Sequence, residues 1–171
     1  VGVGAYESSR AREYLATITK LTELYELCAI CDSSTRSLEE AGVRFGVSAR
    51  YTDFEKMLEV EKPDVVCVLV PTDGQTVLAL TAAQHGCHII TEIPYALTLS
   101  LGDAIGRACE ENGVIWEVAE NLWLRPHEPL KQKLVRDGLL GKVIHARAFY
   151  THGSYHVFNA MRMILGNEPV R

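Results

Sequence analysis

The sequence predicts an α/β fold built on a doubly wound parallel sheet, followed by the start of a second α+β domain. Short apolar segments rich in β-branched residues alternate with longer segments of helical periodicity up to residue 120. That alternation is typical of parallel strands joined by right-handed helical crossovers. Beyond residue 120 the alternation stops, so we expect one domain over residues 1–120 and the beginning of another, incomplete, over residues 121–171.

The individual elements of the first domain follow from local signals. Apolar segments that read as strands buried on both faces cover residues 25–32, 64–71, 87–92 and 113–120. The helical patterns between them cover residues 7–24, 36–45, 53–61, 74–85 and 100–112. Helix starts are predicted at the capping residues Asp53 and Ser100, and helix ends at Gly86 and Gly113.

The second domain is predicted from three segments. An amphipathic helix ends at Gly138 or Gly141, a strand with alternating polarity covers residues 142–153, and a further helix ends at Gly166. One strand and its neighbouring helices do not make an independent domain. A partner chain would cover the exposed strand edge at residues 142–151, so a homo-oligomer is possible.

Composition excludes several classes of protein. A formal net charge of −5 with scattered basic residues argues against nucleic-acid and anionic-membrane partners. The most apolar stretch, Val65 to Val70, is too short to span a bilayer, and no secretory leader is visible, so we expect a cytoplasmic protein. Cys28 and Cys31 form a C-x-x-C within an apolar strand, where buried structural cysteines are favoured over a redox pair.

The first residues resemble a phosphate-binding turn. In Gly2-Val3-Gly4-Ala5-Tyr6-Glu7, the two glycines can provide the tight bend and the close approach to a pyrophosphate. Glu7 stands where a third glycine is expected, and Ser8, Ser9 or Arg10 would have to supply compensating donors. Such a turn normally follows a strand, so we expect that first strand to lie outside these 171 residues.

Asp32 ends the next predicted strand, where an acidic residue can accept hydrogen bonds from the ribose hydroxyls of NAD. In an alternative interpretation Asp32 only initiates a turn. Ser33, Ser34 and Arg36 could instead hold a 2′-phosphate, which leaves NADP possible. Val70 and Pro71 end the following strand, at the sheet edge where the nicotinamide ribose would pass.

These residues carry a family resemblance. The segments "GVGA", "AICD", "EKPDVVCVLVPTDGQTVLALTAAQHGCHIITEIP", "VAENLWLRP", "DGLLGKV" and "YHVFNAMRMILGNEPV" resemble, in order and spacing, the glucose–fructose oxidoreductase/inositol dehydrogenase (Gfo/Idh/MocA) family. The resemblance implies an N-terminal NAD(P)-binding Rossmann domain, a C-terminal open-sheet domain, and a small-molecule substrate such as a sugar or polyol.

One departure from the family pattern affects its chemistry. The family's Glu-Lys-Pro is Glu92-Ile93-Pro94 here, and isoleucine cannot perform the proton transfer that the lysine assists. The resemblance leaves Glu92 to fix the cofactor's ribose or amide, with a solvated loop carboxylate as the alternative. A cis bond is plausible at Pro94. Gln75 similarly replaces a residue that is often histidine in relatives.

The resemblance also supplies candidates beyond residue 120. His156 matches the histidine that exchanges a proton with the substrate, while His152 stands where the family has an aspartate. Asn121 would contact the cofactor, and the candidate substrate-binding residues are Arg125, His152, Tyr155 and His156. Tyr155 could equally be a packing residue. His152 and His156 have the spacing of half a metal site, but no third ligand follows, so no metal is expected.

Two functions remain open on this sequence. The first is an NAD(P)-dependent oxidoreductase that transfers a hydride between a nicotinamide cofactor and a small carbonyl or alcohol, with His156 and Glu92 as catalytic residues. The alternative is a cofactor-binding but non-catalytic sensor or assembly partner, because Ile93 replaces the lysine. A fragment of a longer enzyme would also explain the abrupt start and end.

Overall fold

The structure is a computed structural model that describes residues 1–4, 10–121, 124–147 and 154–165. The chain divides into two compact units, Val1–Ala119 and Glu120–Arg171.

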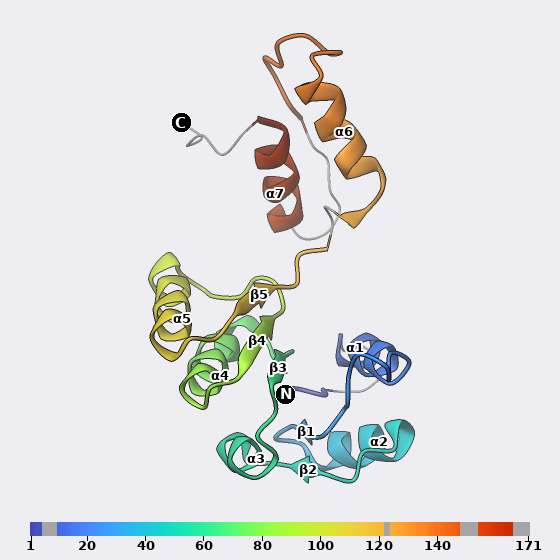
Figure 1. The fold of residues 1–171 in the computed structure, drawn as a ribbon, viewed down its shortest axis with the longest axis vertical. Coiled ribbons are helices and arrows are strands. Elements are labelled where there is room, and N and C mark those ends of the chain that lie inside the picture. Colours follow the sequence, from blue (N-terminus) through green and yellow to red (C-terminus); the bar gives the residue numbers. More distant parts are fainter. Residues whose placement is uncertain (5–9, 122–123, 148–153, 166–171) are drawn as a thin grey trace. The chain divides into compact units, whose positions relative to one another are not determined.

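The first unit contains a parallel sheet in two hydrogen-bonded parts (Figure 1). One part pairs β1 (Ile30–Cys31) with β2 (Arg50–Tyr51), and the other has the order β3 (Val65–Val68), β4 (His88–Thr91) and β5 (Trp116–Val118). Every pairing in both parts is parallel.

The backbone of Val1 and Gly2 joins the two parts of the sheet. The Val1 nitrogen donates to the Cys67 carbonyl oxygen at 2.7 Å, and the Leu69 nitrogen donates to the Val1 carbonyl oxygen at 2.9 Å. On the other side the Gly2 nitrogen donates to the Cys31 carbonyl oxygen at 2.8 Å. Val1 and Gly2 therefore lie between β1 and β3, where a first strand is expected, but residues 1–4 are not themselves assigned to a strand.

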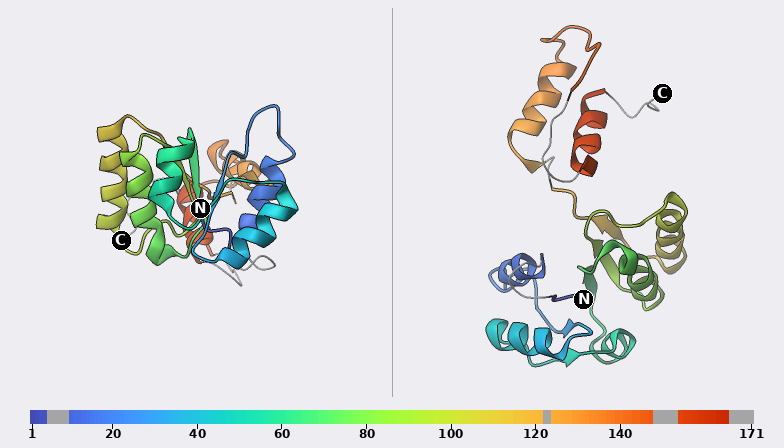
Figure 2. Two further views of the ribbon diagram at one scale, coloured as in Figure 1. Left: turned by 90° about the horizontal axis from the view of Figure 1, so that it is seen from below. Right: turned by 180° about the vertical axis from the view of Figure 1, so that it is seen from behind.

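Helices cover both faces of this sheet, which confirms the doubly wound α/β prediction (Figure 2). On one face lie α1 (Ala11–Ile18) and α2 (Thr35–Phe45), and their buried side chains pack with Val3 and Ile30. On the other lie α3 (Phe54–Glu61), α4 (Thr72–Gln84) and α5 (Leu99–Asn112), and their core includes β3 and β4 residues such as Val68 and Ile89.

The helix boundaries follow from their caps. Asp53 caps α3 as predicted, because its side chain accepts from the Lys56 nitrogen. The predicted cap at Ser100 is wrong: Thr98 accepts from the Leu101 nitrogen at 3.3 Å and starts α5 two residues earlier. Gly113 ends α5 at φ +66°, a left-handed conformation that glycine adopts without steric cost.

Two segments of the first unit differ from the sequence-based expectation. The helix predicted over residues 7–24 ends at Ile18, since the following residues to 24 form turns and residues 5–9 lie outside the described residues. The β-branched run from Thr17 to Thr19 lowers helix propensity at that point. Sequence analysis also missed β2, whose two half-buried residues carry too little apolar pattern to stand out.

The second unit contains two described helices, α6 (His127–Arg136) and α7 (Ser154–Leu165). The predicted strand over residues 142–153 is wrong over residues 142–147, which have no strand structure; residues 148–153 lie outside the described residues. A strand needs a hydrogen-bonded neighbour, and the pattern alone did not provide one. None of the described helices combines the length and the apolar character needed to cross a membrane.

Candidate functional site

The carboxyl ends of the strands meet at one edge of the first unit's sheet. The paired registers end at Val68, Thr91 and Val118, and hydrogen bonds continue one residue further. The Glu92 nitrogen donates to the Val68 carbonyl oxygen at 3.2 Å, and the Ala119 nitrogen donates to that of Thr91 at 2.9 Å. Open α/β sheets bind ligands at this edge, where the strand order reverses.

The glycine turn at this edge has the geometry that a phosphate-binding turn requires. Gly2 has φ +83° and Gly4 has φ +62°, both in the region that favours glycine. A Cβ atom on Gly2 would lie 2.6 Å from Val70 Cγ1 and 2.9 Å from the Val70 nitrogen, so no larger residue fits. Half-buried Val70 thus packs against the glycine turn. Exposed Pro71 is the residue directly before α4. The predicted Ala5 and Tyr6 lie outside the described residues.

Asp32 ties the glycine turn to the end of β1. Its Oδ2 accepts from the Gly4 nitrogen and its Oδ1 accepts from the Ser34 nitrogen, both at 2.8 Å. The bond from the Ser34 nitrogen confirms that Asp32 initiates a turn, and the bond from the Gly4 nitrogen ties it to the glycine turn, while its contact with a ribose stays a prediction. Each carboxylate oxygen has a second acceptor position, so the side chain retains capacity for ribose hydroxyls.

The residues that would hold a 2′-phosphate are engaged elsewhere. The Ser34 hydroxyl accepts from the Ser37 nitrogen and caps α2, and Arg36 Nε pairs with Glu40 Oε1 at 2.8 Å. Ser33 is exposed and makes the turn between β1 and α2. Ser34 keeps its O–H donor and the Arg36 side chain is 88% exposed, so the choice between a 2′-hydroxyl and a 2′-phosphate stays a prediction.

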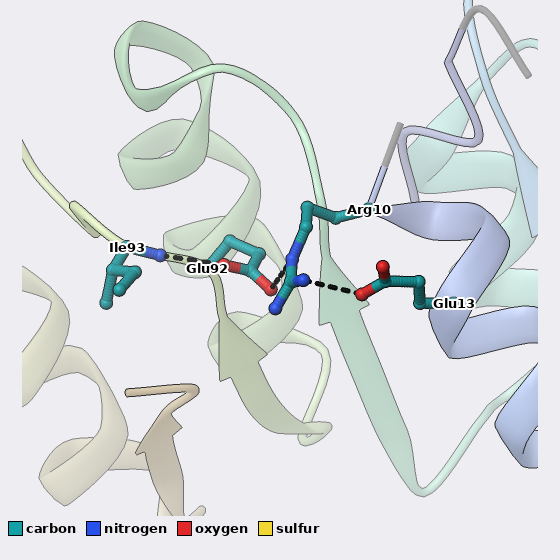
Figure 3. A network of polar contacts seen from close by, with 4 residues as sticks. All are labelled: Arg10, Glu13, Glu92 and Ile93. Atoms are coloured by element: carbon teal, nitrogen blue, oxygen red, sulfur yellow. Dashed lines mark hydrogen bonds and ion pairs between the residues drawn. The ribbon is translucent and has the colours of Figure 1, made fainter. Parts of the chain in front are cut away.

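Glu92 lies at the end of β4 in a network of polar contacts (Figure 3). Its Oε1 accepts from Arg10 Nε at 3.3 Å and its Oε2 accepts from the Ile93 nitrogen at 3.2 Å. Arg10 Nη1 in turn contacts Glu13 Oε2 at 2.5 Å. Glu92 is only 9% exposed, so the alternative interpretation as a solvated loop carboxylate is wrong.

The buried Glu92 perturbs its two neighbours on α1. Burial lowers the pKa of Arg10, but the charge of Glu92 and the hydrogen bond to it outweigh that effect, so the pKa is raised. Burial raises the pKa of Tyr14, and the charge of Glu92 and a hydrogen bond to it raise it further. Both groups therefore keep their protons next to the Glu92 carboxylate.

Gln75 supports the turn that follows Glu92. Its side chain is 1% exposed, and its Nε2 donates to the Pro94 carbonyl oxygen at 3.1 Å. The Ile93–Pro94 bond is cis, as the sequence suggested. Within the described part of the chain Gln75 Oε1 has no hydrogen-bond partner.

The second unit brings together a histidine and a carboxylate. His156 Nδ1 lies 2.7 Å from Glu120 Oε2, and the two side chains are 23% and 14% exposed. The Tyr155 ring lies 4.8 Å from the imidazole, and Tyr155 is 41% exposed. Asn121 and Arg125 are exposed, and His152 lies outside the described residues. The roles predicted for these residues stay predictions.

Sequence analysis missed three residues that contact the candidate site residues Glu92 and His156. Arg10 appeared only as a possible phosphate ligand, and Tyr14 and Glu120 did not appear at all. Arg10 and Tyr14 are one helical turn apart, which is a signal for a shared face. No local pattern links them to Glu92, which is 82 residues from Arg10 in the sequence. Glu120 directly precedes the candidate Asn121, and this position at a strand end was its only signal.

The cysteines of the C-x-x-C are both free thiols. Burial raises the pKa of Cys28 and of Cys31, which disfavours the thiolate that redox chemistry needs. Their environment matches that of small hydrophobic residues.

Known proteins share both the sequence and the fold. Residues 1–120 match the family described as "Oxidoreductase family, NAD-binding Rossmann fold". D-apiose dehydrogenase of Paraburkholderia graminis is 32% identical over 143 residues, covering 84% of this chain and 38% of that protein. Levoglucosan dehydrogenase of Pseudarthrobacter phenanthrenivorans is 27% identical over 121 residues, covering 71% and 31%. The chain thus spans less than half the length of these relatives.

Solved structures share the fold at low identity. The scyllo-inositol dehydrogenase of Lactobacillus casei with bound NAD(H) and scyllo-inositol has a TM-score of 0.80 at 15% identity, covering 95% of this chain and 54% of that one. The WlbA dehydrogenase of Bordetella pertussis in complex with NADH and UDP-GlcNAcA has a TM-score of 0.76 at 24% identity, covering 82% and 39%. Since the family match extends over residues 1–120, the chain belongs to the Gfo/Idh/MocA oxidoreductase family and carries its NAD-binding Rossmann fold.

Proposed function

We propose that this chain belongs to an NAD-dependent dehydrogenase that acts on a small alcohol or carbonyl compound such as a sugar or polyol. The observation that carries the proposal is the Asp32 carboxylate, which accepts from the Gly4 nitrogen at the carboxyl end of β1. This contact supports Asp32 as an acceptor for ribose hydroxyls, beside a turn whose Gly2 position has no room for a larger residue. Relatives named D-apiose dehydrogenase and levoglucosan dehydrogenase agree with a sugar-like substrate.

The residues of the first unit fit an NAD molecule. Gly2 and Gly4 would face the pyrophosphate and Asp32 the adenosine ribose, while Glu92 would orient the ribose or amide of the nicotinamide half. Bound there, NAD supplies a hydride acceptor for alcohol oxidation. Arg10 holds Glu92 as an anion, which suits hydrogen-bond acceptance rather than proton exchange. Ile93 has no titratable proton and contributes none.

Proton exchange falls to His156 in this proposal. An imidazole can take up the hydroxyl proton of an alcohol at neutral pH and return it to water in the next step. The 2.7 Å contact with Glu120 stabilises the positive charge that the ring acquires when it does so. Asn121, Arg125, His152 and Tyr155 are the predicted contacts to cofactor and substrate.

A second function is favoured by one observation. Ile93 stands where the family has its lysine, so the chain can bind NAD without catalysing hydride transfer, as a sensor or assembly partner does. The two functions share the cofactor site and differ in whether any substrate is oxidised.

The cofactor site is tested by NAD binding to the purified protein. NAD should raise the melting temperature of the wild type, since a ligand of the native state stabilises it. Asp32→Asn should weaken NAD binding about 10–100-fold, because a charged acceptor of hydrogen bonds is lost. Asp64→Asn is the matched control, as Asp64 is exposed and precedes β3 at the opposite edge of the sheet. Equal binding by both variants would remove Asp32 from the site.

The substrate class is tested by NAD reduction, followed at 340 nm for the full-length protein with a panel of sugars and polyols. Reduction with one of them supports the dehydrogenase. NAD binding without reduction by any member of the panel supports the non-catalytic alternative. The same measurements with NADP should show weaker binding, because the Asp32 carboxylate would lie beside the negatively charged 2′-phosphate.

A further inference from the structure

The pair formed by Glu120 and His156 joins two segments that are far apart in the sequence. Glu120 follows the last strand of the first unit, and His156 lies in the first turn of α7. Their side chains meet at 2.7 Å, and both are more than three-quarters buried. A contact this short between a carboxylate oxygen and a ring nitrogen is a charge-assisted hydrogen bond.

The contact with Glu120 determines which ring nitrogen of His156 carries the proton. A carboxylate only accepts hydrogen bonds, so Nδ1 must be the protonated nitrogen in the neutral ring. Nε2 is then the basic nitrogen, and a proton taken up by the ring arrives there. The hydrogen bond also fixes the orientation of the ring, which would otherwise rotate about its side-chain bonds.

We propose that Glu120 is a positioning residue, which holds His156 in the tautomer with the proton on Nδ1 and thereby assigns proton exchange to Nε2. The inference rests on the proposed dehydrogenase function. In alcohol oxidation Nε2 would take up the hydroxyl proton of the substrate, and bound NAD would supply the hydride acceptor. The Glu120 carboxylate balances the charge of the imidazolium.

The first experiment measures the tautomer of the His156 ring from its ring-nitrogen shifts in the unmodified chain. In a protein labelled with ¹⁵N at histidine, the ring-nitrogen shifts of His156 are assigned by their loss in His156→Asn. The wild type should show a protonated Nδ1, and Glu120→Gln should show a mixture of tautomers or the opposite one. Glu120→Asp should restore part of the wild-type signal. An unchanged tautomer in Glu120→Gln would overturn the inference.

The second experiment uses turnover. Glu120→Gln should lower kcat about 10–100-fold, a part of the factor that a general base contributes, with KM nearly unchanged. Glu117→Gln is the matched control, because Glu117 is an exposed glutamate in β5, three residues earlier. A loss of activity in both variants would overturn the specific role of Glu120.

The outcomes separate this inference from the function on which it rests. If wild-type turnover is present and Glu120→Gln changes neither tautomer nor kcat, only the positioning role is wrong. If His156→Asn keeps full activity, the proposed role of His156 is wrong, and with it the catalytic part of the inference.

Discussion

Two buried carboxylates differ mainly in the group that faces them. The Glu92 side chain in the Rossmann unit is 11% exposed and faces the Arg10 guanidinium, whereas that of Glu120 in the second unit is 14% exposed and faces the His156 imidazole. Arginine keeps its charge at every pH that proteins tolerate, so Glu92 has a permanent counter-ion. Histidine gains and loses a proton near neutrality, so Glu120 faces a group that can take part in acid–base chemistry. Two glutamates of similar burial therefore differ in their partners. Glu92 pairs with a permanent cation, and Glu120 pairs with a group that can exchange a proton.

In our proposal, the lysine that the family has at Ile93 is not needed for proton exchange. Ile93 has no titratable group beside Glu92, and Glu92 accepts from Arg10 Nε and from the Ile93 nitrogen. In our proposal the acid–base group is then supplied by the second unit alone. The predicted catalytic role of Glu92 accordingly becomes one of orienting the cofactor.

The largest effect is expected from removing the exchangeable proton. His156→Asn should lower kcat about 10²–10⁴-fold, the usual contribution of a general acid–base group, while NAD affinity stays unchanged. Steady-state NAD reduction and NAD titration measure the two quantities. His145→Asn, at an exposed position of the same unit, is the control and should retain wild-type turnover. An active His156→Asn protein would mean that the pair with Glu120 is only structural.

A smaller effect is expected from removing the permanent cation. Arg10→Met leaves the Glu92 carboxylate buried without its counter-ion and should lower the free energy of unfolding by about 1–2 kcal/mol. The loss is below that of a fully buried pair, because the Arg10 side chain is 50% exposed and water screens it. Urea unfolding measures the difference.

Arg36→Met is the matched control for this variant. Its guanidinium also pairs with a glutamate through Nε, but both side chains are on the surface, so unfolding should be unchanged. Equal midpoints for the two variants would show that Glu92 does not depend on Arg10.

Substitution of Ile93 can also place a titratable neighbour beside Glu92. Ile93→Lys places an ammonium beside Glu92, where it can assist proton transfer. Combined with His156→Asn, it should raise kcat about 5-fold over His156→Asn alone, a small part of what a placed acid–base group contributes. Ile93→Met is the control of similar length without the charge. If the two double variants are equally slow, the Glu92 region has no part in proton exchange.

The sequence predicted the framework of these sites better than their contacts. Apolar runs and caps located the strand ends, and with them Asp32 and Glu92, because those signals are local. The partners of Glu92 and Glu120 are 82 and 36 residues away, and only the folded sheet and helices bring them together. The aspartate expected four residues before His156 is absent, and a carboxylate from another segment contacts the ring instead. Alternating polarity over residues 142–147 predicted a strand wrongly, because a pattern does not supply a pairing partner.

The smallest effect concerns Tyr14, the second neighbour of Glu92. Its raised pKa means that at alkaline pH the folded state binds the phenolic proton more tightly than the unfolded state. Stability is unaffected while both states are protonated, and it falls as the pH rises above about 10, where the unfolded tyrosine ionises. The fall should be less than about 1.4 kcal/mol per pH unit, because Tyr14 is only partly buried.

Tyr14→Phe should therefore make the loss of stability between pH 9.5 and 11.5 (roughly the range over which tyrosine titrates) shallower than in the wild type. The buried thiols, whose pKa values burial also raises, ionise in both proteins, so their contribution cancels in the comparison. Tyr25→Phe changes an exposed tyrosine and should leave the slope as it is. If stability falls equally steeply with pH in the wild type and in Tyr14→Phe, the Glu92 carboxylate does not raise the pKa of Tyr14. Of the two neighbours, only Arg10 then stabilises the charge of Glu92.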